Sequence, residues 1–131
     1  MLVDTSVWID FFNGHESKQA QRLTRAIEEA EPIFIPGVVL TEILLGLKHE
    51  AEAKRIASLL DTFDAVPEPA RVDYIEAARI YRLCRGKGFT IRSTIDCVIA
   101  RLCLRDGLPL LTKDGDFKSI AGCVPLQLVD A

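Results

Sequence analysis

The hydrophobic positions of this chain form two kinds of pattern, short apolar runs and stretches with helical periodicity. Apolar runs of only a few residues are typical of strands that enter a core, and they predict strands at residues 2–4, 33–36, 64–67, 108–112 and 126–129. Apolar residues that recur every three or four positions predict helices at residues 5–12, 17–31, 37–47, 51–63, 70–84 and 94–105. Because strands and helices alternate, we predict an α/β fold with a mostly parallel central sheet flanked by helices.

Particular residues mark the ends of two of these helices. We expect Thr5 or Ser6 near the cap of the first helix, because short hydroxyl side chains are favoured there. Ser93 or Thr94 is expected to cap the last predicted helix, and Gly107 to end it.

The composition fits one globular domain that spans residues 1–131. Hydrophobic residues make up 49% of the chain and charged residues 27%, which provides for a core and excludes a disordered chain. Asp4 interrupts the N-terminus before a signal peptide could form, and no apolar run approaches the roughly 18 residues of a membrane span. We therefore expect a soluble, cytoplasmic protein. The four cysteines have no metal-finger spacing, and we interpret them as buried apolar residues.

Several acidic residues stand apart from the polar faces on which most of the 19 acids lie. Asp4 ends the first predicted strand, and Asp114 follows the fourth, with Asp116 two residues later. Glu42 and Asp96 lie among apolar residues, and we expect each in the first turn of its helix. A charge in such surroundings needs a partner, because burying it alone is costly.

Each of these acids also has a purely structural explanation. Asp4 could cap the first helix, where Asp is favoured. Asp96 could form a capping box with Ser93, and Glu42 could pair with a buried arginine. The Asp-Gly pair after the fourth strand could simply form a turn.

The predicted topology nevertheless gathers these acids. The carboxyl ends of parallel strands and the starts of the following helices meet at one edge of the sheet. Carboxylates that converge there would repel one another, or one would take up a proton, unless a divalent cation neutralises them. All candidate ligands are oxygens, with no His or Cys beside them, which favours Mg²⁺ or Mn²⁺ over zinc.

The order of these residues resembles the PIN-domain nucleases, and most closely the VapC-type toxins of prokaryotic toxin–antitoxin pairs. The resemblance covers essentially the whole chain and rests on LVDTSVWIDFF, TEILLG, IDCVIA and LLTKDGDF. It implies a three-layer PIN-like fold and a metal-dependent endoribonuclease. The residues that it implies for the site are the metal-binding acids Asp4, Glu42, Asp96 and Asp114, the additional metal-binding acid Asp116, and the supporting hydroxyl residues Ser6 and Thr112.

We hypothesise that this site hydrolyses phosphodiester bonds, with Asp4 and Asp96 as the chief ligands of Mg²⁺ or Mn²⁺. Glu42 would bind a metal through water or position the attacking water. Asp114, with Asp116, would complete the cluster or hold a second ion. The resemblance implies an RNA substrate and cleavage to a 3′-hydroxyl and a 5′-phosphate. It also implies a homodimer and an inhibitory antitoxin that binds across the active site in a toxin–antitoxin hetero-oligomer.

The basic residues are unevenly distributed in this chain of net charge −3. Residues 79–92, RIYRLCRGKGFTIR, contain five basic residues, two aromatic residues and no acids. This run is a candidate for the rim that contacts RNA, through Arg85, Lys87 and Arg92. The alternative is a solvated helix face whose basic end complements the helix dipole.

The aromatic residues Trp8, Phe11 and Phe12 recur at helical spacing, which predicts that they pack in the core. Some of them could instead line an apolar groove near the N-terminal helices, where an amphipathic antitoxin helix would fit.

Other classes of protein share parts of this pattern. Haloacid-dehalogenase-like phosphatases also place an Asp after the first strand, but they need a second Asp where this chain has Ser6. A receiver-like signalling domain would use Lys113 with a pair of early acids, of which only one is present. A PIN nuclease that processes RNA without being a toxin, and a catalytically silent PIN-like binding module, remain as alternatives.

Overall fold

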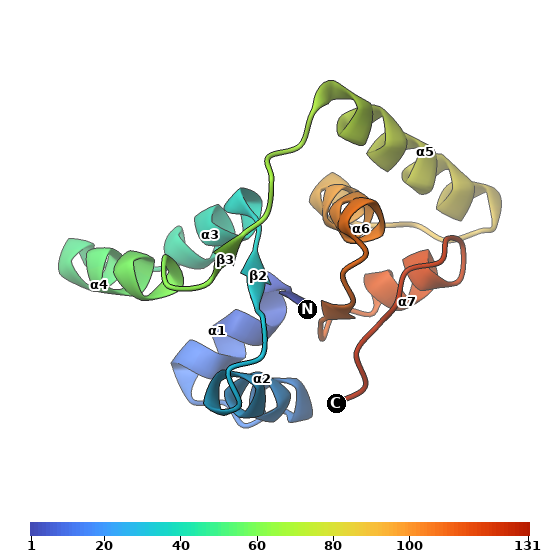
Figure 1. The fold of residues 1–131 in the computed structure, drawn as a ribbon. Coiled ribbons are helices and arrows are strands. Elements are labelled where there is room, and N and C mark those ends of the chain that lie inside the picture. The colour runs from blue at the N-terminus through green and yellow to red at the C-terminus, as the bar shows by residue number, and fades with distance from the viewer.

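A four-stranded, entirely parallel sheet lies at the centre of the fold (Figure 1), in a computed structural model that describes all 131 residues. The strand order is β3-β2-β1-β4, and helices flank the sheet, which confirms the predicted architecture. The strands are β1 (Leu2–Val3), β2 (Phe34–Ile35), β3 (Asp64–Ala65) and β4 (Leu110–Leu111). The helices are α1 (Thr5–Asn13), α2 (Lys18–Glu28), α3 (Gly37–Leu44), α4 (Glu50–Leu60), α5 (Arg71–Gly86), α6 (Thr94–Asp106) and α7 (Asp116–Ala121).

Two neighbouring strands, β1 and the edge strand β4, are wholly apolar because helices cover both faces of the sheet. Leu2 and Val3 of β1 lie opposite Leu110 and Leu111 of β4, and all four are inaccessible to solvent. A parallel sheet buried on both faces requires such continuous apolar runs. The β1–β4 pairing also brings the segments that follow these two strands side by side at one edge, although they are far apart in sequence.

The helices pack in two groups around the sheet. In Figure 1, α3 and α4 lie to the left of the strands, whereas α5, α6 and α7 lie to the right. Contacts join α1 to α2 and α3, and join α6 to α5 and α7. No helix is long and apolar enough to cross a membrane.

An aromatic cluster fixes α1 against the rest of the core. Trp8 is fully buried, and its ring centroid lies 5.8 Å from those of Phe11 and Phe12 and 5.2 Å from that of Phe63. Edge and offset contacts at such distances stabilise aromatic pairs beyond the burial of their area. The predicted core packing is confirmed for Trp8, while Phe11 and Phe12 are partly buried against the core.

One buried ionic cluster joins α5 to α6. Asp73 accepts hydrogen bonds from Arg101 Nε at 3.0 Å, from Arg105 Nη1 at 2.9 Å and from the backbone N–H of Ala70 at 2.8 Å. Only 2% of the Asp73 side chain is exposed. The backbone bond from Ala70 and then the two arginines hold the pKa of Asp73 below its ordinary value. Asp73 therefore stays ionised and anchors two helices to one another.

The cysteines are free thiols in the structure. Cys84, Cys97 and Cys103 are buried, as predicted for small apolar residues, and Cys123 is partly exposed.

Two parts of the predicted element order were wrong. The segment predicted as a last strand, residues 126–129, forms only an isolated parallel bridge between Leu110 and Leu128. The short helix α7 was not predicted, because its first turn belongs to the polar segment that we interpreted as a turn. The predicted helix at residues 17–31 is α2, which ends earlier, at Glu28. It cannot continue because Ala30 adopts a positive φ of 54° and Pro32 follows.

Candidate active site

Asp4 has two structural roles at the end of β1. Its carboxylate accepts a hydrogen bond from the backbone N–H of Ser6 at 3.4 Å, so Asp4 is the N-cap of α1. Thr5 and Ser6 lie next to this cap as the first two residues of the helix, and the alternative that Asp4 caps α1 is confirmed. The side chain of Asp4 is nevertheless buried beyond what a surface cap requires.

Hydroxyl groups from two segments hold the carboxylate of Asp4. Ser6 Oγ donates to Asp4 Oδ2 at 2.8 Å, and Thr112 Oγ1 donates to the same oxygen at 3.0 Å. Ser6 Oγ also accepts from the backbone N–H of Lys113 at 3.0 Å. Ser6 and Thr112, the two hydroxyl residues predicted to support the site, therefore both contact the carboxylate of Asp4. Asp4 Oδ1 is left without a hydrogen bond and can face a ligand.

Glu42 is half-buried on α3 and bonds back to α1. Thr5 Oγ1 donates to Glu42 Oε1 at 2.9 Å. No arginine pairs with Glu42, which removes the structural explanation considered from the sequence. Since α3 begins at Gly37, Glu42 lies in the second turn of the helix, and the prediction of the first turn was wrong.

Asp96 lies in the first turn of α6 and is almost fully buried. Ser93 caps this helix by accepting a hydrogen bond from the backbone N–H of Ile95 at 3.2 Å, as predicted. The carboxylate of Asp96 makes no hydrogen bond to the backbone of Ser93, so the two do not form a capping box. Helix capping therefore does not explain why an acid is buried at this position.

Three carboxylates form the tightest part of the site. Asp96, Asp114 and Asp116 each offer one oxygen, and these oxygens lie within 4.8 Å of one another. We call this group the acidic triad. Burial, followed by the charges of Asp114, Asp4, Asp116 and Glu42, raises the pKa of Asp96 from 3.8 to about 7. The other four predicted acids thus all act on Asp96 electrostatically, which places Asp4 and Glu42 near the triad.

Local geometry and one arginine fix the two acids that follow β4. Asp114 Oδ1 accepts from the backbone N–H of Asp116 at 2.9 Å, which closes the turn into α7. Arg92 Nη2 donates to Asp114 Oδ1 at 3.1 Å, and Arg92 Nε donates to Asp116 Oδ2 at 3.2 Å. The turn suggested by the Asp-Gly pair is therefore present, and the same residues also join the acidic cluster. Nothing in the sequence indicated the bridge made by Arg92.

A second ion pair that the sequence did not reveal lies at the border of this site. Lys113 Nζ donates to the carboxylate of Asp10 on α1. This contact lowers the pKa of Asp10 and ties the loop after β4 to α1. Lys113 was considered only as a possible catalytic lysine of a signalling domain, whereas here its partner is Asp10.

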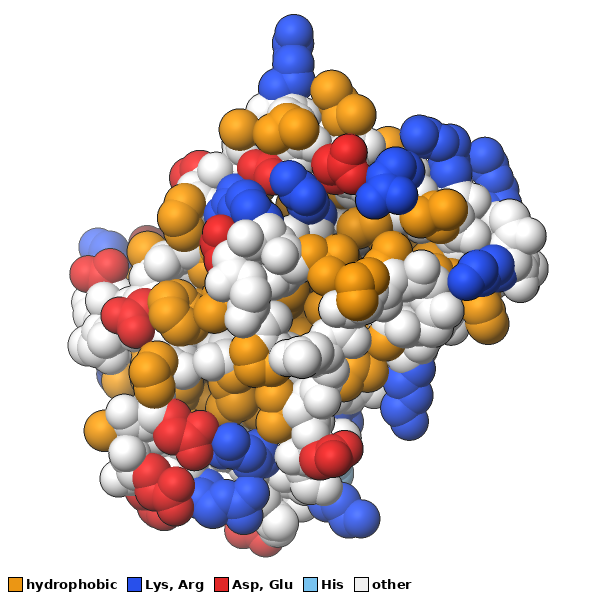
Figure 2. Space-filling view, turned by 45° about the vertical axis from the view of Figure 1, so that its right-hand side comes forward, with side chains coloured by type: hydrophobic (Ala, Val, Ile, Leu, Met, Phe, Trp, Pro, Cys, Tyr) orange, Lys and Arg blue, Asp and Glu red, His pale blue; other side chains and the backbone are white.

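The predicted basic rim is exposed along the end of α5. The guanidinium of Arg85 lies 5.9 Å from the ring centroid of Tyr81, and Lys87 Nζ reaches the backbone oxygen of Gly122 at 3.5 Å. Figure 2 shows Lys and Arg side chains with apolar side chains between them on this face. A groove of about 520 Å³, lined mainly by apolar residues, lies between α5 and α6.

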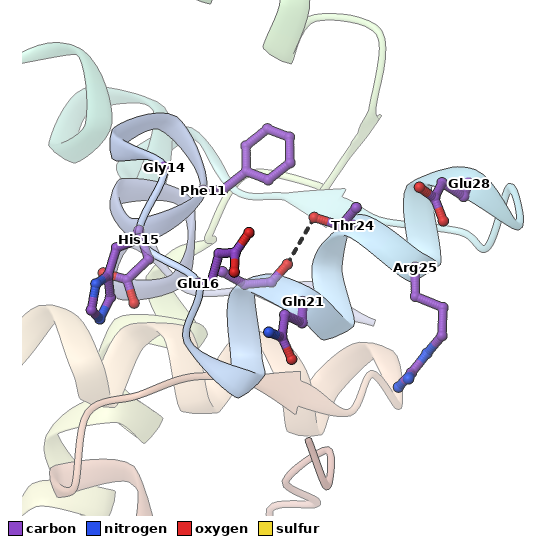
Figure 3. Close-up of a pocket in the computed structure, with 10 residues that line it drawn as sticks. Phe11, Gly14, His15, Glu16, Gln21, Thr24, Arg25 and Glu28 are labelled. Carbon is purple, nitrogen blue, oxygen red and sulfur yellow. Dashed lines mark hydrogen bonds between the residues drawn. The ribbon is translucent and has the colours of Figure 1, made fainter.

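The groove beside the N-terminal helices differs from the apolar one considered from the sequence. It lies between α1 and α2, has a volume of about 420 Å³ and is lined mostly by polar and charged residues (Figure 3). Glu16, Gln21 and Arg25 line it beside Phe11. This pocket therefore differs from the apolar groove considered as an alternative, although Phe11 does line it.

Comparison with known proteins assigns this architecture to a known group. Residues 1–122 match the family profile described as "PIN domain". The chain is 34% identical to ribonuclease VapC11 of Mycobacterium tuberculosis over 128 residues, which are 97% of this chain and 96% of that protein. Its fold resembles that of VapBC2 from Rickettsia felis bound to a promoter DNA fragment, with a TM-score of 0.76, 18% identity and coverage of 99% and 97% of the two chains. It also resembles M. tuberculosis VapC20, a toxin that cleaves the sarcin-ricin loop, with a TM-score of 0.65, 20% identity and coverage of 95% and 97%.

Proposed function

This chain belongs to the PIN domain family, and from that premise we propose that it is a metal-dependent endoribonuclease and the toxin of a toxin–antitoxin pair. The observation that supports this most directly is the acidic triad, supplemented by the buried Asp4 and the half-buried Glu42. Helix capping accounts for Asp4 and turn closure for Asp114, but neither explains why five acids gather at one place, and burial of Asp96 among them costs stability. A divalent cation bound among these acids would neutralise their charge and so explain why they gather there.

The chemistry of the residues fits a small divalent cation. The oxygens that Asp96, Asp114 and Asp116 offer lie within 4.8 Å of one another, so one small cation could contact all three. All donors are carboxylate oxygens, which suit Mg²⁺ or Mn²⁺. We propose that Asp96, Asp114 and Asp116 hold this ion, and that Asp4 uses its free Oδ1. When bound, the ion supplies a water of lowered pKa and neutralises charge on the phosphate.

The residues of the chain position the other parts of the reaction. Ser6 and Thr112 keep Asp4 oriented by occupying its Oδ2, so that Oδ1 points to the site. Thr5 holds Glu42 Oε1, which leaves Oε2 to accept a proton from the attacking water or to orient it. The proposed products are a 3′-hydroxyl and a 5′-phosphate.

Removal of the metal tests this function directly. RNA incubated with the purified protein should be cleaved, EDTA should abolish the cleavage, and added Mg²⁺ or Mn²⁺ should restore it. Sequencing of the new 5′ ends gives the cleavage sites, and a phosphomonoester substrate separates a nuclease from a phosphatase. Cleavage that persists in EDTA would contradict the proposal, as would release of phosphate from the monoester without cleavage of RNA.

The basic rim is proposed to hold the RNA backbone. Arg85→Glu combined with Lys87→Glu should weaken RNA binding, because both residues are exposed and face no acid. The slope of log K against log salt should become shallower by about 0.7 for each lost phosphate contact. Binding is best measured in the Asp96→Asn background, where the RNA is expected to stay intact.

Two basic residues on another helix supply the control for this experiment. Lys54 and Arg55 are exposed on α4, so Lys54→Glu with Arg55→Glu makes the same change of charge elsewhere. The variant changed at Arg85 and Lys87 should bind RNA more weakly and with a shallower salt slope. The variant changed at Lys54 and Arg55 should keep both the affinity and the slope of the wild type. An equal effect of both pairs would show a response to net charge alone and would exclude the rim.

The partners follow from the proposed toxin role. Solved structures similar to this chain are described as VapBC and as a toxin–antitoxin complex, so we propose an inhibitory antitoxin and a homodimeric toxin within a hetero-oligomer. The apolar groove between α5 and α6, beside the exposed Tyr74 and Ile75, provides apolar surface for one such contact. The proposed location is the cytoplasm, where RNA is available. A small DNA-binding protein encoded directly upstream would support the toxin role over RNA processing.

A further inference from the structure

Arg92 bridges two members of the acidic triad. Its Nη2 bonds Asp114 Oδ1 at 3.1 Å, and its Nε bonds Asp116 Oδ2 at 3.2 Å. No other lysine or arginine forms an ion pair with a member of the triad. A single guanidinium therefore offsets the repulsion between Asp114 and Asp116 in the metal-free protein.

The side chain of Arg92 can leave without disturbing the acids. It is 75% exposed, and exposed ion pairs contribute little stability in water. Asp116 keeps a second bond at 3.0 Å from the backbone N–H of Arg92, and Asp114 keeps its bond from the backbone N–H of Asp116. The backbone thus holds both carboxylates in place, and the guanidinium adds mainly charge.

A divalent cation and the guanidinium compete for the same negative charge. A cation bound by Asp114 and Asp116 would place two positive charges beside a third, which like-charge repulsion opposes. Of the two positive groups, the exposed guanidinium of Arg92 is the one that can move away. Once released, it would project at the edge of the triad, where the RNA phosphate must approach, and a guanidinium binds phosphate through two parallel hydrogen bonds.

We propose that Arg92 is a displaceable internal cation, which neutralises the acidic triad until the metal binds and then contacts the phosphate of the RNA. This inference rests on the proposed metal-dependent nuclease function. It distinguishes Arg92 from Arg85 and Lys87, which face no acid and are proposed to contact RNA with or without metal.

The affinity for Mn²⁺ alone tests the first half of the proposal. Arg92→Gln should bind Mn²⁺ about two- to fivefold more tightly than the wild type by calorimetry, because the cation no longer competes with an exposed ion pair. The metal-free Arg92→Gln protein should melt at a lower temperature than the wild type, and Mn²⁺ should raise its melting temperature by more. Arg92→Lys, which keeps the charge but not the two-pronged geometry, should lie between the two.

Arg82→Gln is the matched control, since Arg82 is an exposed arginine of α5 that makes no ion pair. Its affinity for Mn²⁺ should equal that of the wild type. Unchanged or weaker Mn²⁺ binding by Arg92→Gln would overturn the proposal, and weaker binding would show instead that Arg92 organises the acids for the metal.

Kinetics with RNA test the second half. Arg92→Gln should raise the KM for RNA at saturating Mn²⁺, and an unchanged KM would exclude the phosphate contact. If the wild type cleaves RNA with Mn²⁺ but Arg92→Gln has the same Mn²⁺ affinity as the wild type, this inference alone is wrong. A wild-type protein that binds no Mn²⁺ would overturn both this inference and the proposed metal dependence.

Discussion

Asp96→Asn is expected to lower RNA cleavage by about a thousandfold or more while the protein remains folded, since loss of a metal ligand removes several kcal/mol of transition-state stabilisation. Asparagine has nearly the shape of aspartate, so the first turn of α6 keeps its packing. The measurement is the initial rate of cleavage at saturating Mn²⁺, with circular dichroism to show the fold.

Stability at different pH values gives this variant a second signature. Because the pKa of Asp96 is about 7 in the folded protein and 3.8 ordinarily, the metal-free folded protein keeps a proton between these values that the unfolded chain has lost. The contribution of this group to stability therefore falls as the pH rises from about 4 to 7 and stays low above that range. Asn does not titrate, so the metal-free variant should exceed the wild type in melting temperature, by a margin that grows from pH 5 to pH 8.

Asp61→Asn provides the control, because Asp61 is an exposed acid at the end of α4. It should change neither the rate of cleavage nor the dependence of the melting temperature on pH. Full activity of Asp96→Asn would remove Asp96 from the catalytic site. A pH-independent difference in melting temperature would contradict the raised pKa.

Asp73→Ala is expected to cause the largest loss of stability of any single change of an acid in this chain. The change leaves Arg101 and Arg105 without the buried partner that joins α5 to α6. Removing one member of a buried ion pair is strongly destabilising, because the remaining charges lose their compensation. The melting temperature should fall by several degrees or more, as measured by thermal denaturation of the metal-free protein.

Glu76→Gln is the matched control for this second prediction. Glu76 lies one turn further along α5 and pairs with the exposed Arg79, so its loss should shift the melting temperature little. Acid should also unfold the wild type partly through Asp73. Its pKa is lowered by folding, so its contribution is present above its ordinary pKa of 3.8 and is lost as the pH falls through the lowered value. Equal melting temperatures of Asp73→Ala and Glu76→Gln would show that the cluster does not anchor the helices.

Prediction from the sequence succeeded for features that depend on neighbouring residues. The strand β4 was found because Leu110 and Leu111 belong to an apolar run too short for a helix. Gly107 ends α6, as its residue type predicted, and it adopts a left-handed φ of 67° there. The acids that the fold brings together were singled out because charges among apolar residues, or at the tip of a buried strand, are out of place. Residue chemistry alone then favoured an oxygen-ligated metal.

Prediction failed where residues distant in the sequence compete for the same group. Residue type indicated that Asp4 could cap α1, but it did not reveal that Thr112, more than 100 residues away, bonds the same carboxylate. The sequence assigned Arg92 to RNA because it belongs to a basic run, but it did not reveal that Arg92 also contacts Asp114 and Asp116, which lie more than 20 residues away. Asp73 was not noticed, because an acid in the first turn of a helix is ordinary until its burial is known.

The sequence by itself determined the parallel sheet, most of its strands and helices, and the acids that come together, because hydrophobic periodicity and side-chain chemistry are properties of the local chain. The tertiary structure alone decided which acids come closest, because it places Asp116 in the triad with Asp96 and Asp114. It also places Asp4 near the triad, where Ser6 and Thr112 donate hydrogen bonds to its carboxylate. It also decided the ionic partners of Arg92 and Asp73. These outcomes depend on distances of a few ångströms between segments that the pairing of β1 with β4 and the packing of α5 on α6 bring together.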